Sequence, residues 1–310
     1  MSGAAPSPFP LNKIAVIGPG LIGGAILWAC LLKKLAKEIS VCEINKNIWP
    51  DIQRSLPSGP EISFHFQTYP HEAAKDANLV FLCLPIERML DVAKEISGIP
   101  GLTPSNTLAE NAVITDVGSV KRSIVADLTA IFGGRFVGGH PMAGKEKGGF
   151  DPESAPLLFE GKTILLTPTP KTDPDAIATV KAFWKAVGAK VDDSLTPEEH
   201  DRRTAQISHL PHLVAAALAA IVDDASLHAS GPGFRDTTRV AAGPAAMWRD
   251  ILLANREEVG GILEVFLREL EKARRALAEN RGEELQALLE KANDTRRKLE
   301  EISPSPHKTP

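Results

Sequence analysis

One histidine, His140, stands in the part of the sequence richest in small and ionisable residues, Gly138 to Gly149 (GGHPMAGKEKGG). An imidazole exchanges protons near neutral pH, and glycines let a ligand come close to the backbone. The run follows an apolar stretch at 135–138, so His140 would lie at the end of a strand. These features suit proton transfer by His140, although an isolated loop histidine is more often held by backbone groups.

Two more groups of polar residues lie in the second half of the chain. Ser208 and His212 are four residues apart and would share a helix face, as would His209 and His212. A metal held by His209 and His212 is the alternative interpretation. No carboxylate completes such a ligand set at helical spacing, so we expect no metal.

The stretch 233–239 (GFRDTTR) carries two arginines, and another follows at Arg249. An arginine can hold a carboxylate through two parallel hydrogen bonds. For Arg235 and Arg249, an ion pair between helices, with Asp236 or Asp250, is the favoured interpretation.

The elements that must position these residues are clearest at 13–24 (KIAVIGPGLIGG), where an apolar strand, a glycine turn and a helix follow one another. Gly18 permits the tight turn, Gly20 lets the backbone approach a pyrophosphate, and Gly23 lets the helix pack closely. Glu43 follows Gly23 by about 20 residues, the separation at which an acidic residue meets the ribose hydroxyls of a dinucleotide. The alternative is a strand–helix turn with no ligand.

Apolar runs and helical patterns alternate from about 13 to 193, which predicts a mostly parallel sheet covered by helices. The expected strands are 13–17, 39–43, 78–84, 112–116, 135–138, 162–167 and 188–192, and the expected helices are 86–97, 120–131 and 173–187. Ligands gather at the carboxyl ends of such strands, so the ends at Leu84-Pro85 and at Asp116 to Ser119 are site candidates.

The pattern becomes all-helical after Thr196, whose TPEE sequence is typical of a helix start. We expect that helix to reach about Val222 with a kink at Pro211, and to be buried from Leu213 onward. A loop at 231–233 and helices at 245–257, 259–279 and 283–301 should follow. The predicted organisation is a disordered leader (1–12), a dinucleotide-binding domain (13–193), a helical substrate and dimerisation domain (194–303) and a tail (304–310).

Composition excludes several classes of protein. The 310 residues carry a formal charge of −4, with 43% hydrophobic and 24% charged residues, so nucleic acid is not an expected partner. Three cysteines in apolar runs fit a reducing compartment rather than a disulfide framework. The N-terminus lacks the features of a signal peptide, and no apolar run has membrane-spanning length. We expect a cytoplasmic protein that binds no membrane and forms a homodimer through its helices.

The motifs together resemble the TyrA-type prephenate and arogenate dehydrogenases. The matching stretches are VIGPGLIGG, LCLPI, TDVGSVK, GGHPMAGKEKGGF, ISHLPH and GFRDTTRVAAGPAAMWRDILLANRE, in the order that the family has them. The resemblance implies a Rossmann-type α/β domain followed by an all-α dimerisation domain. It also implies NAD-dependent oxidation of prephenate with loss of CO2 in tyrosine biosynthesis.

The resemblance assigns roles to individual residues. His140 would be the catalytic histidine at the ring hydroxyl, with Ser119 beside it and the nicotinamide. The substrate pocket would contain Arg239, as the carboxylate-binding residue, with His212, Ser208, Glu146, Asp236 and Trp248. The cofactor would lie against Gly18, Gly20, Leu21, Ile22, Gly23, Glu43, Leu84, Pro85 and Asp116.

The sequence departs from the family at two positions: Ala25 replaces a common hydroxyl residue at the helix start, and Lys145 stands where many members have a small hydroxyl residue. Arogenate or dual specificity is the nearest alternative function. A β-hydroxyacid dehydrogenase and a non-catalytic dinucleotide-sensing dimer are more distant alternatives. The first lacks GGHPMAG and SHLPH, and the second would not need His140 and Arg239 together.

Overall fold

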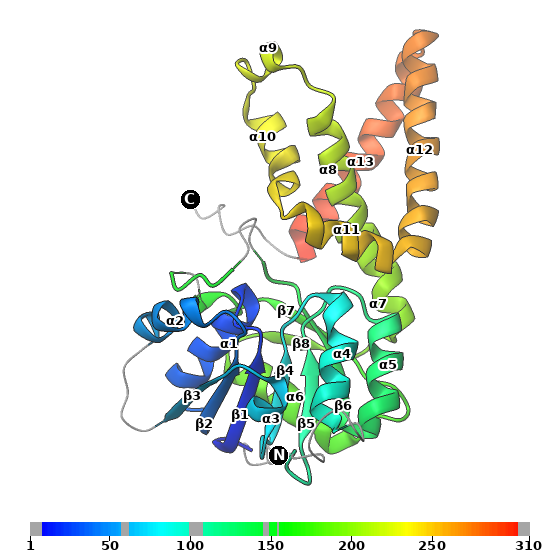
Figure 1. Cartoon of the computed structure of the whole chain (residues 1–310). Helices are drawn as coiled ribbons and strands as arrows, with labels where there is room; N and C mark the ends of the chain where they lie inside the picture. Colours follow the sequence, from blue (N-terminus) through cyan, green and yellow to red (C-terminus); the bar gives the residue numbers. More distant parts are fainter. Residues whose placement is uncertain (1–7, 57–61, 99–107, 145–148, 154, 303–310) are drawn as a thin grey trace. The chain divides into compact units, whose positions relative to one another are not determined.

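The computed structural model describes residues 8–56, 62–98, 108–144, 149–153 and 155–302. The chain forms two compact units, 1–256 and 257–310. The first unit contains the sheet, the helices that cover it and a set of shorter helices (Figure 1). The second contains two long helices.

The sheet of the first unit has eight strands in the order β3-β2-β1-β4-β5-β6-β7-β8. All neighbouring pairs are parallel except β6 and β7, which are antiparallel. The strands are β1 (Leu11–Ile17), β2 (Ala36–Cys42), β3 (Ser63–Gln67), β4 (Leu79–Leu82), β5 (Val113–Asp116), β6 (Phe136–Pro141), β7 (Thr163–Thr167) and β8 (Lys190–Asp192). This order is that of a Rossmann-type domain, so the predicted fold class is confirmed.

Alternate side chains of the central strands pack into two separate hydrophobic cores, because successive side chains of a strand point to opposite faces. Ile14 and Val16 of β1 belong to a core with residues of α1 (Leu21–Leu32) and α6 (Pro174–Ala186). Ala15 and Ile17 belong to the other core, with residues of α3 (Pro70–Ala74), α4 (Ile86–Ser97) and α5 (Arg122–Phe132). The central strands are therefore covered on both faces, which explains their continuous apolar sequences.

Seven predicted strands and the first three predicted helices are present, with ends that differ by a few residues. The sequence prediction missed β3 and two short helices, α2 (Trp49–Ser55) and α3. Short 3₁₀ segments lie at Lys46–Ile48, Gly133–Arg135, Ala155–Leu157 and Arg239–Ala242.

The helix predicted from Thr196 begins as expected, with a capping box between Thr196 and Glu199. It runs as α7 (Pro197–Thr204), a π-helical turn (Ala205–His209) and α8 (Leu210–Ala220). The π turn lies directly before Pro211, so the predicted proline defect is present as a local change of helical winding.

Two predictions for this helical part were wrong. On α8 only Leu210, His212 and Ala215 are buried, and the other apolar side chains of this helix are half-buried or exposed. The predicted loop at 231–233 is instead the start of α10 (Pro232–Thr238), since Pro232 at the first helical position suits a helix N-terminus. The remaining helices of the unit are α9 (Asp224–Leu227) and α11 (Ala245–Ala254).

The second unit consists of α12 (Arg256–Ala278) and α13 (Gly282–Ile302). Both were predicted, and both carry ion pairs between residues three or four apart, such as Arg274 with Glu271 and Arg296 with Glu300. Such pairs lie on solvated faces and stabilise a helix only slightly. Neither these helices nor any other helix in the described ranges is long and apolar enough to cross a membrane.

Candidate active site

The glycine turn closes over the carboxyl end of β1, and its backbone makes contacts that side chains would prevent. A Cβ on Gly18 would lie 2.5 Å from the carbonyl oxygen of Cys83, and the φ of Gly18 is +90°. A Cβ on Gly23 would lie 2.1 Å from the carbonyl oxygen of Gly18. By contrast, a Cβ on Gly20 would have nothing within 4 Å. Gly18 and Gly23 are thus required by packing, whereas Gly20 leaves open space in front of the turn.

A cavity of about 630 Å³ lies at this sheet edge, within the first unit. Its sheet side is formed by the start of α1, the ends of β4 and β6, and the turn after β5. Its helical side is formed by residues from the π turn, the 3₁₀ segment at Arg239–Ala242 and α11. Its predicted lining residues are Gly20, Leu21, Ile22, Gly23, Leu84, Pro85, Ser119, His140, Ser208, Arg239 and Trp248.

His140 is held at the end of β6 by a second histidine. Its Nδ1 lies 2.8 Å from Nε2 of His200, and Nδ1 of His200 lies 2.8 Å from Oδ1 of Asp201. The two imidazole rings are tilted by 59°. His140 is 7% exposed and lines the cavity, whereas His200 is fully buried behind it.

Asp201 is fixed in place by backbone donors from the turn that precedes α5. Its Oδ1 accepts from the N–H of Lys121 at 2.7 Å, and its Oδ2 accepts from the N–H of Arg122 at 2.9 Å. Its own carbonyl accepts from the amide of Asn255 at 2.8 Å, and that amide also lies 3.1 Å from Nδ1 of His209. Asp201 therefore joins α7 to the sheet edge and to the end of α11.

Burial keeps the histidines of the site neutral. Loss of water lowers the pKa of His140 well below its ordinary value, and neighbouring His200, Lys121 and His209 lower it further. Burial lowers the pKa of His200 as well, although the hydrogen bond to Asp201 opposes this change. Burial raises the pKa of Asp201, but hydrogen bonds from His200 and from the N–H groups of Arg122 and Lys121 outweigh it and lower that pKa. At neutral pH the site thus contains two neutral imidazoles and one carboxylate.

Asp116 was predicted to bind the cofactor, but it does not line the cavity. Its side chain is fully buried and forms an ion pair with the buried ammonium of Lys121. It also accepts from the N–H groups of Gly118 at 2.8 Å and Gly139 at 3.0 Å. Since all these partners belong to the chain itself, Asp116 fixes the turn between β5 and α5 and pins β6 beside it.

The helical side of the cavity is formed around an aromatic stack. The ring of His212 lies 3.6 Å from the Trp248 indole, with an angle of 12° between the planes. A Cβ on Gly243 would lie 2.6 Å from Nε1 of Trp248 and 3.3 Å from Cε1 of His212, so only glycine leaves room for this stack. Trp248 lines the cavity, and His212 supports it from behind.

The other predicted site residues lie elsewhere. Gly18 and Glu43 do not line the cavity; Glu43 lies just after β2, where its Oε1 accepts from the N–H of Asn45 at 2.7 Å. Asp236 is exposed on α10 and outside the cavity lining, and Glu146 lies outside the described residues, as does Lys145. Arg249 pairs with Asp250 at 2.7 Å, but both residues lie on α11, so this is not the interhelix ion pair that the sequence predicted.

The sequence prediction missed His200, Asp201 and Asn255. The only signal was a His-Asp pair directly after a helix-capping sequence, which has no specificity for a site. Among the described residues, no group of three His, Cys, Asp or Glu side chains is arranged to hold a metal ion.

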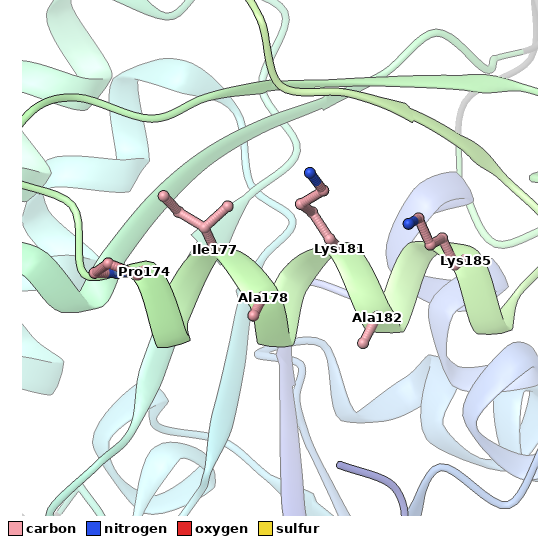
Figure 2. Close-up of a pocket in the computed structure, with 6 residues that line it drawn as sticks. All are labelled: Pro174, Ile177, Ala178, Lys181, Ala182 and Lys185. Carbon is pink, nitrogen blue, oxygen red and sulfur yellow. The ribbon is translucent and has the colours of Figure 1, made fainter. Parts of the chain in front are cut away.

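A second depression, of about 400 Å³, runs along α6. Figure 2 shows that all six labelled residues belong to this one helix. Its polar groups are those of Lys181 and Lys185, and Lys181 pairs with Asp193 at 2.6 Å. We assign no function to this depression.

Comparison with known proteins agrees with the geometry. Residues 51–193 match the family model "Prephenate dehydrogenase, nucleotide-binding domain", and residues 196–291 match "Prephenate dehydrogenase, dimerization domain". The chain belongs to the prephenate dehydrogenase family. The predictions of this family and of an NAD-dependent dehydrogenase are thereby confirmed.

Relatives of this chain include both prephenate and cyclohexadienyl dehydrogenases. The prephenate dehydrogenase of Bacillus subtilis is 33% identical over 92% of this chain and 75% of its own. The cyclohexadienyl dehydrogenase of Zymomonas mobilis is 32% identical over 88% of this chain and 91% of its own. The prephenate dehydrogenase of Aquifex aeolicus, solved with hydroxyphenyl propionate and NAD+, has a TM-score of 0.77 and 32% identity over 93% of this chain and 98% of its own.

Proposed function

We propose that this chain oxidises prephenate to 4-hydroxyphenylpyruvate with NAD, releasing CO2, as a step of tyrosine biosynthesis. The observation that carries the proposal is a neutral histidine, His140, in a cavity that extends from a glycine turn to an arginine, Arg239. Arogenate is the second candidate substrate, because a Synechocystis arogenate dehydrogenase is a structural relative with a TM-score of 0.71 and 26% identity over 92% of this chain and 99% of its own.

The residues at the start of α1 fit a dinucleotide. Gly20 faces open space, and the first N–H groups of α1 have no side-chain cap, so a pyrophosphate could approach both. Bound there, NAD would supply the acceptor for the hydride that leaves the substrate ring. We assign Glu43, just after β2, to the adenosine ribose hydroxyls because of its spacing from the glycine turn, and Leu84 and Pro85, which line the cavity, to the cofactor.

His140 would take the proton of the ring hydroxyl as hydride leaves that carbon, and would return it to the ring oxygen once CO2 has left and the ring is aromatic. A neutral imidazole is required, and the lowered pKa of His140 provides it at neutral pH. Ser119 lines the cavity too, and we assign it to a hydrogen bond with the same hydroxyl. Aromatisation of the ring makes the overall step downhill, so orientation and exclusion of water are the main tasks of the site.

The helical side would hold the substrate. Arg239 is assigned to a substrate carboxylate, since a guanidinium can bind it through two hydrogen bonds. Ser208 and Trp248 line the cavity, with His212 stacked behind the indole, and would bound the ring. We retain Glu146 and Asp236 as candidates at the pocket mouth from the family resemblance alone.

The test is a spectrophotometric assay of NADH formation with purified protein, NAD and either prephenate or arogenate. We expect the higher kcat/KM with prephenate. The variant His140→Asn should lose roughly 10²–10⁴-fold in kcat, because it keeps a polar side chain but removes the base. A control, His65→Asn, changes an exposed histidine on β3 and should keep normal activity. Near-normal kcat in His140→Asn would refute the assignment, and no turnover with either substrate would refute the proposed function.

We further propose that the chain acts as a cytoplasmic homodimer formed through its C-terminal helices. The match to a dimerization domain supports this, as do exposed leucines on α12 such as Leu267 and Leu277. The domain boundary near 193 and 194 also remains our proposal. Analytical ultracentrifugation would decide the oligomeric state.

A further inference from the structure

Three buried side chains form a hydrogen-bonded chain that leads away from the cavity behind His140. His140 contacts His200, and His200 contacts Asp201, each at 2.8 Å. They are 7%, 0% and 1% exposed, respectively. These hydrogen bonds join β6 to α7, since His140 and His200 are 60 positions apart in the sequence.

The direction of each hydrogen bond follows from the carboxylate at the far end. Asp201 already accepts from the backbone N–H groups of Lys121 and Arg122, and as an ionised carboxylate it has no proton to donate. The proton between Asp201 and His200 must therefore be on Nδ1 of His200. A neutral His200 then has a lone pair on Nε2, so Nδ1 of His140 must be the donor in the next bond.

These hydrogen bonds allow only one protonation state of the His140 ring. With its proton on Nδ1, a neutral imidazole has its lone pair on Nε2, and Nε2 is the ring nitrogen left for the cavity that His140 lines. We propose that Asp201 and His200 are positioning residues that hold His140 in the tautomer with an unprotonated Nε2 facing the substrate. The kinetic part of this proposal rests on the proposed function, because it assumes that His140 is the base.

The groups around His140 and His200 favour the neutral form of both imidazoles. The ammonium of Lys121 is fully buried and paired with Asp116, and it disfavours a charge on either imidazole. When Nε2 of His140 takes up a proton, the Nδ1–H bond to His200 stays in place, and the carboxylate of Asp201 lies next along the chain. Without His200, the other tautomer, which has a proton on Nε2 and cannot act as a base, would become accessible.

The first test reads the tautomer directly and needs no substrate. In protein labelled with ¹⁵N-histidine, the two ring nitrogens of each imidazole have shifts that distinguish N–H from a bare lone pair. The signals of His140 are those lost in His140→Asn. We expect Nδ1 of His140 to be protonated and Nε2 unprotonated at neutral pH. A protonated Nε2 in the wild-type protein would overturn the proposal.

The second test compares two substitutions at His200. His200→Phe keeps the ring shape but removes the acceptor, whereas His200→Gln can present an oxygen to His140 and an N–H to Asp201. We expect His200→Phe to lower kcat roughly tenfold, which is part of the usual contribution of a general base. The KM values for prephenate and for NAD should change by less than about twofold. His200→Gln should recover most of the loss. Equal activities of the two variants would contradict a tautomer role.

A matched control uses another histidine that is paired with a carboxylate. His71 lies 2.6 Å from Glu95 and does not line the cavity, so His71→Phe should change neither kcat nor the His140 signals. Melting temperatures of all variants separate a folding defect from a positioning defect. If the wild-type protein turns over neither prephenate nor arogenate, the proposed function fails. The NMR measurement would still show whether His200 and Asp201 hold His140 in the tautomer with an unprotonated Nε2.

Discussion

Gly20 and Gly23, the last two glycines of the GPGLIG motif, should respond differently to the same added methyl group. In Gly20→Ala the new Cβ has nothing within 4 Å, and the φ of −71° suits alanine. We therefore expect the free energy of unfolding to stay within about 0.5 kcal/mol of wild type. In Gly23→Ala the new Cβ would lie 2.1 Å from the Gly18 carbonyl oxygen, which belongs to the backbone and cannot rotate away.

The size of the second effect follows from that distance. Carbon and oxygen need more than 3 Å, so α1 must move by about 1 Å relative to the turn. Overpacking of this kind costs about 1–3 kcal/mol, which corresponds to a melting temperature lower by several degrees. Gly20→Ala, in contrast, should place its methyl where the pyrophosphate would approach, and should weaken NAD binding at least roughly tenfold, or about 1.4 kcal/mol.

Thermal melting and isothermal titration with NAD measure both quantities on the same samples. The expected pattern is normal melting with weak binding for Gly20→Ala, and lowered melting for Gly23→Ala. Wild-type affinity for NAD in Gly20→Ala would show that the pyrophosphate lies elsewhere. Equal melting temperatures for the two variants would refute the packing argument.

Three other predictions test the cofactor pocket, the substrate pocket and the buried histidines. Glu43→Ser should improve kcat/KM with NADP relative to NAD, because the carboxylate would repel a 2′-phosphate; an unchanged ratio would count against Glu43. Arg239→Ala should raise KM for prephenate by the equivalent of about 2–3 kcal/mol, whereas Arg235→Ala, outside the cavity lining, should not; equal KM values would make Arg239 structural. Burial lowers the pKa of His209 to about 4, so its stabilising contribution, on the order of 3 kcal/mol, is complete above its ordinary pKa of 6.5 and is lost as pH falls toward 4. His209→Asn can still accept from Asn255 and should flatten the fall of stability in chemical denaturation between those pH values; an identical slope would refute this.

The sheet could be predicted from the sequence because its central strands are covered on both faces. Apolar runs such as 79–82 are continuous, and each is followed by a helical pattern. The strand β3 was missed because it lies at the edge of the sheet, is only partly buried and alternates Phe64 and Phe66 with polar residues. This alternation is the pattern of a half-buried strand, but it covers few residues and the prediction searched for continuous apolar runs, so the strand was overlooked.

The part of the cavity that is formed by local sequence motifs could be predicted. The glycine turn and His140 each lie at a strand end, and the ends of parallel strands meet at one edge. The same rule predicted Asp116 at the cofactor, whereas in the structure Asp116 is buried, pairs with Lys121 five residues later and does not line the cavity. A sequence rule for strand ends cannot tell whether a carboxylate faces a ligand or a buried partner from its own chain.

The partners of His140 could not be predicted because nothing local connects them to it. Asp201 and His200 come from α7, and their place behind β6 depends on how that helix packs on the start of α5. Asp201 itself determines part of this packing: α5 has no side-chain cap of its own, and both carboxylate oxygens of Asp201 accept its first free N–H groups. One carboxylate thus caps α5 and orients His200. Replacing Asp201 would change stability and tautomer together, whereas replacing His200 leaves the cap in place. Substitutions at His200 are therefore the ones that isolate the effect on His140.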